Sequence, residues 1–145
     1  MIVDQQEQAQ LLIDTFELLG NWEERYRFLI DLGRDMPPML EEDKVDKNKV
    51  EGCLSSVWVV AAGRIEDDQQ LIDFTADSDS AIVRGLISML RKVYSGQPPH
   101  AIVHFDINDL FTKLDLAQHL SMGRRNGLGE MVRRIKVLAA SLAGS

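Results

Sequence analysis

The sequence predicts an α+β fold in which a small antiparallel sheet of about three strands is flanked by helices. Apolar side chains recur at helical spacing over residues 4–19, 22–33 and 82–94 and again near the end of the chain. Two shorter apolar segments, 57–62 and 71–76, enclose a polar turn and are typical of a β-hairpin. Because the helical segments lie on both sides of this hairpin in the chain, helices and sheet are expected to be segregated.

The first two helices form a predicted hairpin. Gly20 ends the first helix, and Asn21 is a candidate N-cap for the second, with Glu24 three positions later as in a capping box. Pro37 and Pro38 stop the second helix, because proline has no amide donor and disfavours helical geometry in the residue before it. The charged segment that follows, residues 41–49, is predicted to be an exposed loop.

The sheet and the remaining helices follow in order. Residues 49–51 are a candidate third strand beside the hairpin. Asp77, Ser78 and Asp79 are candidate caps for the next helix, where acidic groups complement the helix dipole. Residues 101–103 look strand-like after two prolines, residues 106–116 form a short irregular helical stretch, and the last helix is predicted over 126–142.

Length and charge narrow the class of protein. With 145 residues and 45% apolar side chains, the chain is predicted to form one domain, residues 1–145, around one core. A formal net charge of -7 argues against unspecific nucleic-acid binding. No apolar run is long enough to cross a bilayer and the start does not resemble a secretory signal, so a cytoplasmic protein without membrane contact is expected.

The chain has one cysteine, Cys53, which follows Gly52 and precedes an apolar run. A single cysteine cannot form an internal disulfide, and it cannot alone make a zinc or iron-sulfur site. His100, His104 and His119 are the histidines, and we expect His100 and His104 to be surface or capping residues. No metal and no cofactor are therefore predicted for this chain.

Two interpretations of Cys53 remain open from the residues alone. Free cysteine is among the most buried residue types, so Cys53 is a candidate core residue beside a strand. Alternatively, Gly52 permits a positive φ and leaves no side chain beside the sulfur, which would place the thiol at a loop tip that a second protein can approach. A nucleophilic role requires thiolate, and no basic residue adjoins Cys53 in the sequence.

Four blocks of the chain resemble one known family. Residues 50–58, VEGCLSSVW, are similar to the V-x-G-C-x-S-x-V-W signature of the SufE family, the sulfur-acceptor proteins of iron-sulfur cluster assembly. Residues 22–34, 77–86 and 116–128 resemble further blocks of that family in the same order. The departures are Glu51, Ala76 and Asn126, and none of them changes the cysteine. The closely related CsdE branch shares most of these blocks, so the resemblance separates the SufE and CsdE branches only weakly.

The resemblance implies a SufE/IscU-like fold and a carrier function. A cysteine desulfurase, SufS-like or CsdA-like, would use its own pyridoxal phosphate to form a persulfide. Cys53 would accept that sulfur, stimulate the desulfurase, and pass the sulfur to a scaffold complex resembling SufBCD. Such a protein is a carrier and an activator rather than a stand-alone enzyme. A single thiol suits this role, because a second nearby thiol would resolve the persulfide into a disulfide.

Seven further residues are the candidate supporting or partner-binding residues. They are Glu51, Gly52, Leu54, Ser55, Asp79, His119 and Arg124. By resemblance, Asp79 caps the helix after the sheet, and Arg124 lies near the cysteine loop, where a guanidinium would favour thiolate or pair with a partner carboxylate. His119 is expected to be structural rather than a proton carrier.

Two other functions remain as alternatives. Cys53 could act with His119 and Asp79 as a Cys-dependent hydrolase or transferase, which requires the imidazole within hydrogen-bond reach of the sulfur. It could instead be oxidised in a redox-sensing binding module. The sequence leaves open whether the chain forms a homodimer.

Overall fold

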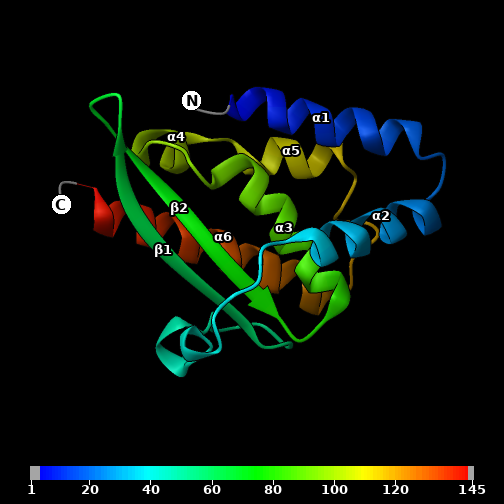
Figure 1. Ribbon diagram of the computed structural model, residues 1–145. Helices are drawn as coiled ribbons and strands as arrows, with labels where there is room; N and C mark the ends of the chain where they lie inside the picture. The colour runs from blue at the N-terminus through cyan, green and yellow to red at the C-terminus, as the bar shows by residue number, and fades with distance from the viewer. Residues whose placement is uncertain (1–3, 144–145) are drawn as a thin grey trace.

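The structure, a computed structural model, describes residues 4–143. Over this range the order of elements is two helices, a hairpin and four more helices, as Figure 1 shows. The predicted α+β class is therefore confirmed. The core is a continuous cluster of buried apolar side chains to which the hairpin and every α-helix of this range contribute.

The sheet is a long two-stranded hairpin. Strand β1 (Val57–Glu66) pairs antiparallel with β2 (Gln69–Ser78), with Val57 opposite Ser78 and Glu66 opposite Gln69. Asp67 and Asp68 form the connection with φ values of 53° and 63°, a left-handed pair that matches the twist of a hairpin. Both strands extend beyond the predicted ranges 57–62 and 71–76, because pairing with a partner strand continues past the apolar residues that revealed them.

The prediction of a third strand is wrong for the part of the chain that the structure describes. Lys49 forms an isolated bridge with Trp58, and the Val50 amide donates to the Val57 carbonyl at 2.8 Å. The backbone then turns at Gly52, whose φ is +86°. The turn ends the pairing with β1 after a single bridge. Residues 51–56 therefore form a loop instead of a strand.

The central helix α3 (Ala81–Tyr94) packs against the hairpin and against α2 (Trp22–Asp35). The two helices approach very closely, because a Cβ built on Gly85 would lie 2.1 Å from the Leu29 carbonyl oxygen. Helix α3 begins differently from the prediction. Its N-cap is Ser80, whose hydroxyl accepts from the Val83 amide at 3.4 Å.

The first helices agree with the sequence. Helix α1 (Gln5–Leu18) ends just before Gly20, and the side chain of Asn21 accepts from the Glu24 amide at 2.9 Å at the start of α2. The following segment is not a plain loop: it contains two short 3-10 helices, Glu41–Asp43 and Asp46–Asn48.

Helices α4 (Pro99–His104) and α5 (Ile107–Lys113) connect α3 to the last helix. The strand-like interpretation of residues 101–103 is wrong. Pro99 occupies the first turn of α4, where proline is favoured, and Ile102 is fully buried in the core. His100 and His104 are both exposed.

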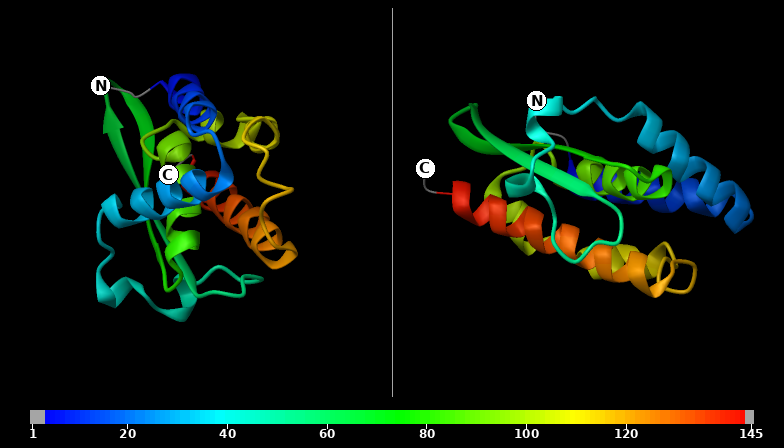
Figure 2. Two further views of the ribbon diagram at one scale, coloured as in Figure 1. Left: turned by 90° about the vertical axis from the view of Figure 1, so that its right-hand side faces the viewer. Right: turned by 90° about the horizontal axis from the view of Figure 1, so that it is seen from below.

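The last helix, α6 (Met122–Leu142), begins four residues before the predicted start. Ser121 is its N-cap, and its hydroxyl accepts from the Arg124 amide at 3.2 Å. The start of this helix is hard to predict because the segment contains glycines at 123, 127 and 129. Each glycine costs about 1 kcal/mol of helix stability relative to alanine. Both views in Figure 2 place the loop before β1 beside the N-terminal half of α6.

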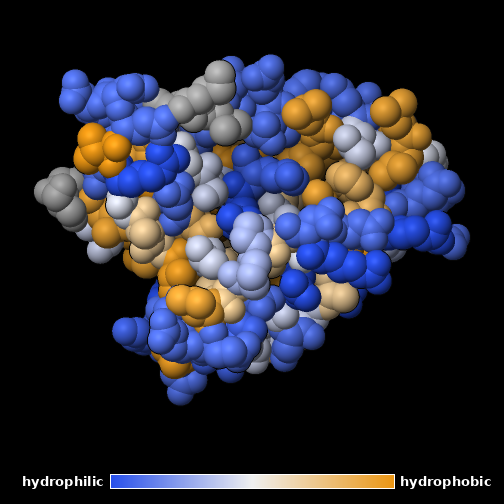
Figure 3. All heavy atoms as spheres, in the orientation of Figure 1, coloured by the Kyte–Doolittle hydropathy of each residue, from blue (hydrophilic) through white to orange (hydrophobic). Residues whose placement is uncertain are grey.

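The surface is largely hydrophilic on the face of Figure 1. Figure 3 shows charged and polar side chains over α1, α2 and the segment below the hairpin, with separated hydrophobic residues between them. Within the described residues, the structure contains no helix that is both long enough and apolar enough to cross a membrane.

Candidate functional site

Cys53 lies on the loop of residues 51–56, between the Val50–Val57 hydrogen bond and the start of β1. The left-handed backbone at Gly52 brings Cys53 back toward α6. The side chain of Cys53 is half-buried, and its thiol is free. The thiol is thus neither a core residue nor a fully exposed one.

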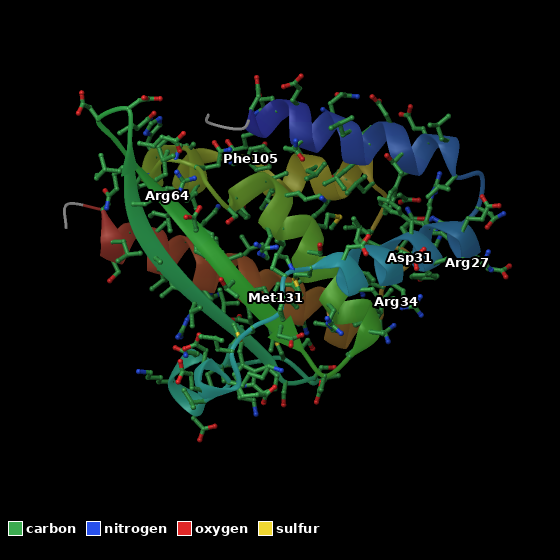
Figure 4. All side chains as sticks on the ribbon, in the orientation of Figure 1. Arg27, Asp31, Arg34, Arg64, Phe105 and Met131 are labelled. Carbon is green, nitrogen blue, oxygen red and sulfur yellow. The ribbon has the colours of Figure 1, made fainter. Side chains whose placement is uncertain are left out.

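The sulfur faces the backbone of α6. Its Sγ donates a hydrogen bond to the Gly127 carbonyl at 3.6 Å, and a Cβ built on Gly127 would lie 3.4 Å from Sγ. A cavity of about 20 Å³ adjoins the sulfur, room for about one water-sized group. Its lining residues come from the loop, β1, α3 and α6: Cys53, Leu54, Ser55, Val57, Val83, Gly123, Arg124, Gly127 and Met131. Met131 is labelled in Figure 4, on α6.

The surroundings favour the neutral thiol. Burial raises the pKa of Cys53 above its usual value, and the negative charge of Glu130 raises it further. The Gly127 carbonyl acts in the same direction, because it accepts a hydrogen bond from the thiol but repels a thiolate. In this conformation Cys53 is a sheltered thiol rather than an activated nucleophile.

Three successive loop residues contact three positions along one face of α6. Gly52 lies beside Glu130, Cys53 lies against Gly127, and Leu54 lies over Gly123. The α6 positions 123, 127 and 130 are four and three residues apart, which places them on one side of the helix. We call this face, formed by Gly123, Gly127 and Glu130, the loop seat.

The Leu54 side chain contacts α6, yet the residue is 89% exposed. A Cβ built on Gly123 would lie 2.4 Å from the Leu54 Cδ1 atom, so glycine is required there for this placement of Leu54. Glu51 is also exposed, and Ser55 is half-buried at the edge of the cavity. The loop therefore presents an apolar and an acidic side chain to solvent next to the sulfur.

Asp79 holds the other end of the loop. Its Oδ1 accepts from the Ser56 amide at 3.1 Å, and its own amide donates to the Ser56 carbonyl at 3.3 Å. The expected role of Asp79 as the cap of α3 is thus wrong, since Ser80 caps that helix. Asp79 lies two residues before the start of α3, and its carboxylate accepts a hydrogen bond from the loop instead of capping the helix.

Arg124 and His119 lie in different places. Arg124 lines the cavity beside the sulfur, as expected from its position before the last helix. The His119 ring stacks on Trp22 with centroids 4.1 Å apart, and its Nδ1 is 3.1 Å from the Asp115 carbonyl. Among the described residues, those around the sulfur do not include His119, so this conformation does not assemble a Cys-His-Asp site.

The sequence did not point to Glu130, Gly123, Gly127 or Met131. The one available signal was the unusual set of glycines in a segment that otherwise has helical periodicity. Within residues 4–143, no three His, Cys, Asp or Glu side chains cluster in a way that could hold a metal ion.

Comparison with known proteins agrees with the motif. The family model described as "SufE: Fe-S metabolism associated domain" matches residues 10–139. This chain belongs to the SufE family.

Relatives in the family are similar over most of their length. An uncharacterised SufE-like protein of Rhizobium meliloti is 42% identical over 125 residues, which cover 86% of this chain and 89% of the relative. An uncharacterised SufE-like protein of Rhizobium etli is also 42% identical, with 86% of this chain and 84% of the relative covered. Family membership associates the chain with iron-sulfur metabolism.

A solved structure shares the fold. The solution structure of a hypothetical protein from Thermus thermophilus superposes with a TM-score of 0.75 over 95% of this chain and 97% of the other. The two sequences are 17% identical, so this likeness concerns the fold alone.

Proposed function

We propose that this SufE-family protein is a sulfur acceptor and carrier for iron-sulfur cluster assembly. The observation that carries the proposal is the placement of the family-motif cysteine, Cys53, half-buried on a short surface loop beside a cavity of about 20 Å³. A persulfide is easily oxidised or lost, so a carrier needs both a sheltered position for its sulfur and a way to present it. A loop between a flexible glycine and β1 meets both needs.

The transfer is a thiol exchange. The Cys53 thiolate attacks the terminal sulfur of a persulfide on the active-site cysteine of a SufS-like or CsdA-like desulfurase. A bond forms between Cys53 Sγ and that sulfur, the sulfur-sulfur bond of the donor breaks, and its electron pair leaves with the desulfurase cysteine as thiolate. Charge and atoms balance without an added oxidant, and the product is a persulfide on Cys53.

The carrier then gives the sulfur to a scaffold complex resembling SufBCD in the cytoplasm. Removal of the persulfide from the desulfurase frees its cysteine for the next cycle, so we expect this chain to stimulate the desulfurase without turnover of its own. Pyridoxal phosphate remains in the desulfurase.

The neighbouring residues have separate roles in this proposal. Gly52 provides the turn on which the loop moves, and Asp79 anchors its far end through Ser56. Arg124, at the cavity, pairs with the thiolate or with a partner carboxylate once the loop has opened. Leu54, Glu51 and Ser55 are the residues nearest the sulfur that a desulfurase would contact. His119 stabilises the fold by stacking on Trp22.

Intact-mass spectrometry tests the proposal. The chain is incubated with a cognate desulfurase and free cysteine, and we expect Cys53 to gain about 32 Da, the mass of one sulfur. Dithiothreitol should remove the adduct, and Cys53→Ser should not acquire it. A protein that gains no sulfur and leaves sulfide production by the desulfurase unchanged would contradict the proposal.

A further inference from the structure

The loop seat places an acidic residue where a neutral contact would serve the packing equally well. A Cβ built on Gly52 would lie 2.9 Å from the Glu130 Cγ and 3.5 Å from its Cδ, so the Glu130 side chain fills the space that Gly52 leaves open. The aliphatic Cγ of Glu130 and its carboxyl carbon Cδ both provide this contact, and the side chain of Gln, which has the same shape, would provide it equally well. The negative charge of Glu130 is therefore not needed for packing, yet it lies beside the residue that precedes the thiol.

The other charges around the sulfur do not cancel this carboxylate. Arg133 approaches Glu130 at 3.6 Å, but its side chain is 73% exposed, and such surface pairs are weak. Arg124 lines the cavity from α6, Glu51 is exposed on the loop, and Asp79 is occupied by the Ser56 amide. Of these groups, Glu130 is the one whose charge raises the pKa of Cys53, after burial itself.

We propose that Glu130 is a positioning residue that keeps Cys53 protonated while the loop occupies its seat on α6, so that leaving the seat activates the thiol. The use of this coupling in sulfur transfer rests on the proposed function. The coupling itself is a property of this chain alone. A desulfurase that draws the loop off α6 would remove the burial, the Gly127 acceptor and the Glu130 charge in one movement.

The coupling has a definite dependence on pH. In the seated loop the thiol has a raised pKa, whereas in an open loop it has an ordinary one. Between these two values the open form loses its proton and the seated form does not, so the open form gains stability. The contribution of the protonated thiol to seating is therefore fully present below the ordinary thiol pKa and is lost as pH rises through that value toward the raised one.

Alkylation of Cys53 by iodoacetamide across a pH series measures this coupling in the isolated protein. Replacing Glu130 by Gln keeps the shape of the side chain and removes its charge. We expect Glu130→Gln to lower the midpoint of the pH profile and to raise the rate near neutral pH about two- to fivefold, as expected when one nearby charge is removed. Glu51→Gln is the matched control, because it removes an equal charge from an exposed position on the cysteine loop and should leave the midpoint unchanged.

Salt concentration separates an electrostatic role from a packing role. Raising the salt concentration should bring the midpoint of the parent protein toward that of Glu130→Gln, while the variant itself should change little. A role in packing alone would also lower the midpoint, because burial itself raises the pKa of Cys53, but the difference between the parent protein and Glu130→Gln would then not depend on salt. An unchanged midpoint in Glu130→Gln, or an equal shift in Glu51→Gln, would overturn the proposal.

A sulfur-transfer assay on the parent protein, read beside the alkylation profiles, distinguishes the two proposals. If the parent protein accepts no sulfur from a desulfurase, the proposed function fails while the alkylation result still decides the role of Glu130. If the parent accepts sulfur and the alkylation midpoint is the same in both variants and the parent, the function stands and the role of Glu130 fails.

Discussion

Glycines make two kinds of close contact in this protein, one between helices in the core and one between a helix and a surface loop. Gly85 of α3 lies against the backbone of α2, where an added Cβ would meet the Leu29 carbonyl oxygen at 2.1 Å. Gly123 and Gly127 of α6 instead lie against the ends of the Leu54 and Cys53 side chains. The first contact is in the buried core and the second is at the surface.

The difference lies in what each glycine meets. A carbonyl oxygen fixed in a helix cannot move without its helix, so the contact between α2 and α3 is permanent. An exposed leucine and a half-buried cysteine on a short loop can rotate or withdraw. Glycine therefore makes a rigid contact between α2 and α3 at Gly85, which we call the joint. On α6 it makes the loop seat, which the loop can leave.

The largest expected effect tests the rigid joint. Gly85→Ala should destabilise the fold by about 3 kcal/mol, because overpacking against a backbone atom forces α2 and α3 apart. Urea unfolding followed by tryptophan fluorescence would measure the loss. Gly129→Ala is the control, since a Cβ there meets no atom within 4 Å. A loss below about 1 kcal/mol would show that the joint is softer than its geometry indicates.

A smaller effect is expected at the anchor of the loop. Asp79→Ala removes the acceptor of the Ser56 amide, a hydrogen bond worth about 1 kcal/mol. The loop should open more often, and Cys53 alkylation should accelerate about fivefold with little change in global stability. Asp79→Asn keeps an acceptor oxygen and should show less acceleration. Equal rates in all three proteins would mean that the Ser56 contact does not restrain the loop.

The smallest effect on stability is expected at the seat. Gly123→Ala displaces the exposed Leu54 but also improves helix propensity by up to about 1 kcal/mol, so the free energy of unfolding should stay within about 1 kcal/mol of the parent. Cys53 should nevertheless be alkylated faster. Gly129→Ala gives the same gain in propensity without touching the loop, and comparison of the two isolates the seat. If Gly123→Ala were as destabilising as Gly85→Ala, the distinction between joint and seat would be wrong.

Sequence reasoning succeeded where the signal is local. The helical periodicity of α1, α2 and α3, the Asn21 cap and the hairpin all follow from residues close together in the chain. It failed where a local signal is ambiguous. The three apolar residues 101–103 fit a strand as well as one turn of helix, and Pro99 begins a helix there, while the third strand is lost to the turn at Gly52.

At the candidate site, sequence motifs located some residues, whereas contacts between distant segments could not be predicted. The motif located Cys53, Gly52 and Arg124 near one another, but it placed Asp79 at a helix cap instead of at the Ser56 amide. Glu130 could not be found, because nothing in its own neighbourhood in the sequence connects it with residue 52. The glycines of α6 have low helix propensity, and their role becomes clear only when the loop lies across them.

By itself, the sequence determined the α+β class, the family and the identity of the single thiol, because periodicity, capping and a compact motif are properties of neighbouring residues. Only the tertiary structure decided the state of that thiol. The hydrogen bond from Cys53 to Gly127 joins residues 74 apart, and the carboxylate that disfavours the thiolate comes from the same helix. Burial and electrostatic interaction depend on distance in space, which the chain fixes only when it folds.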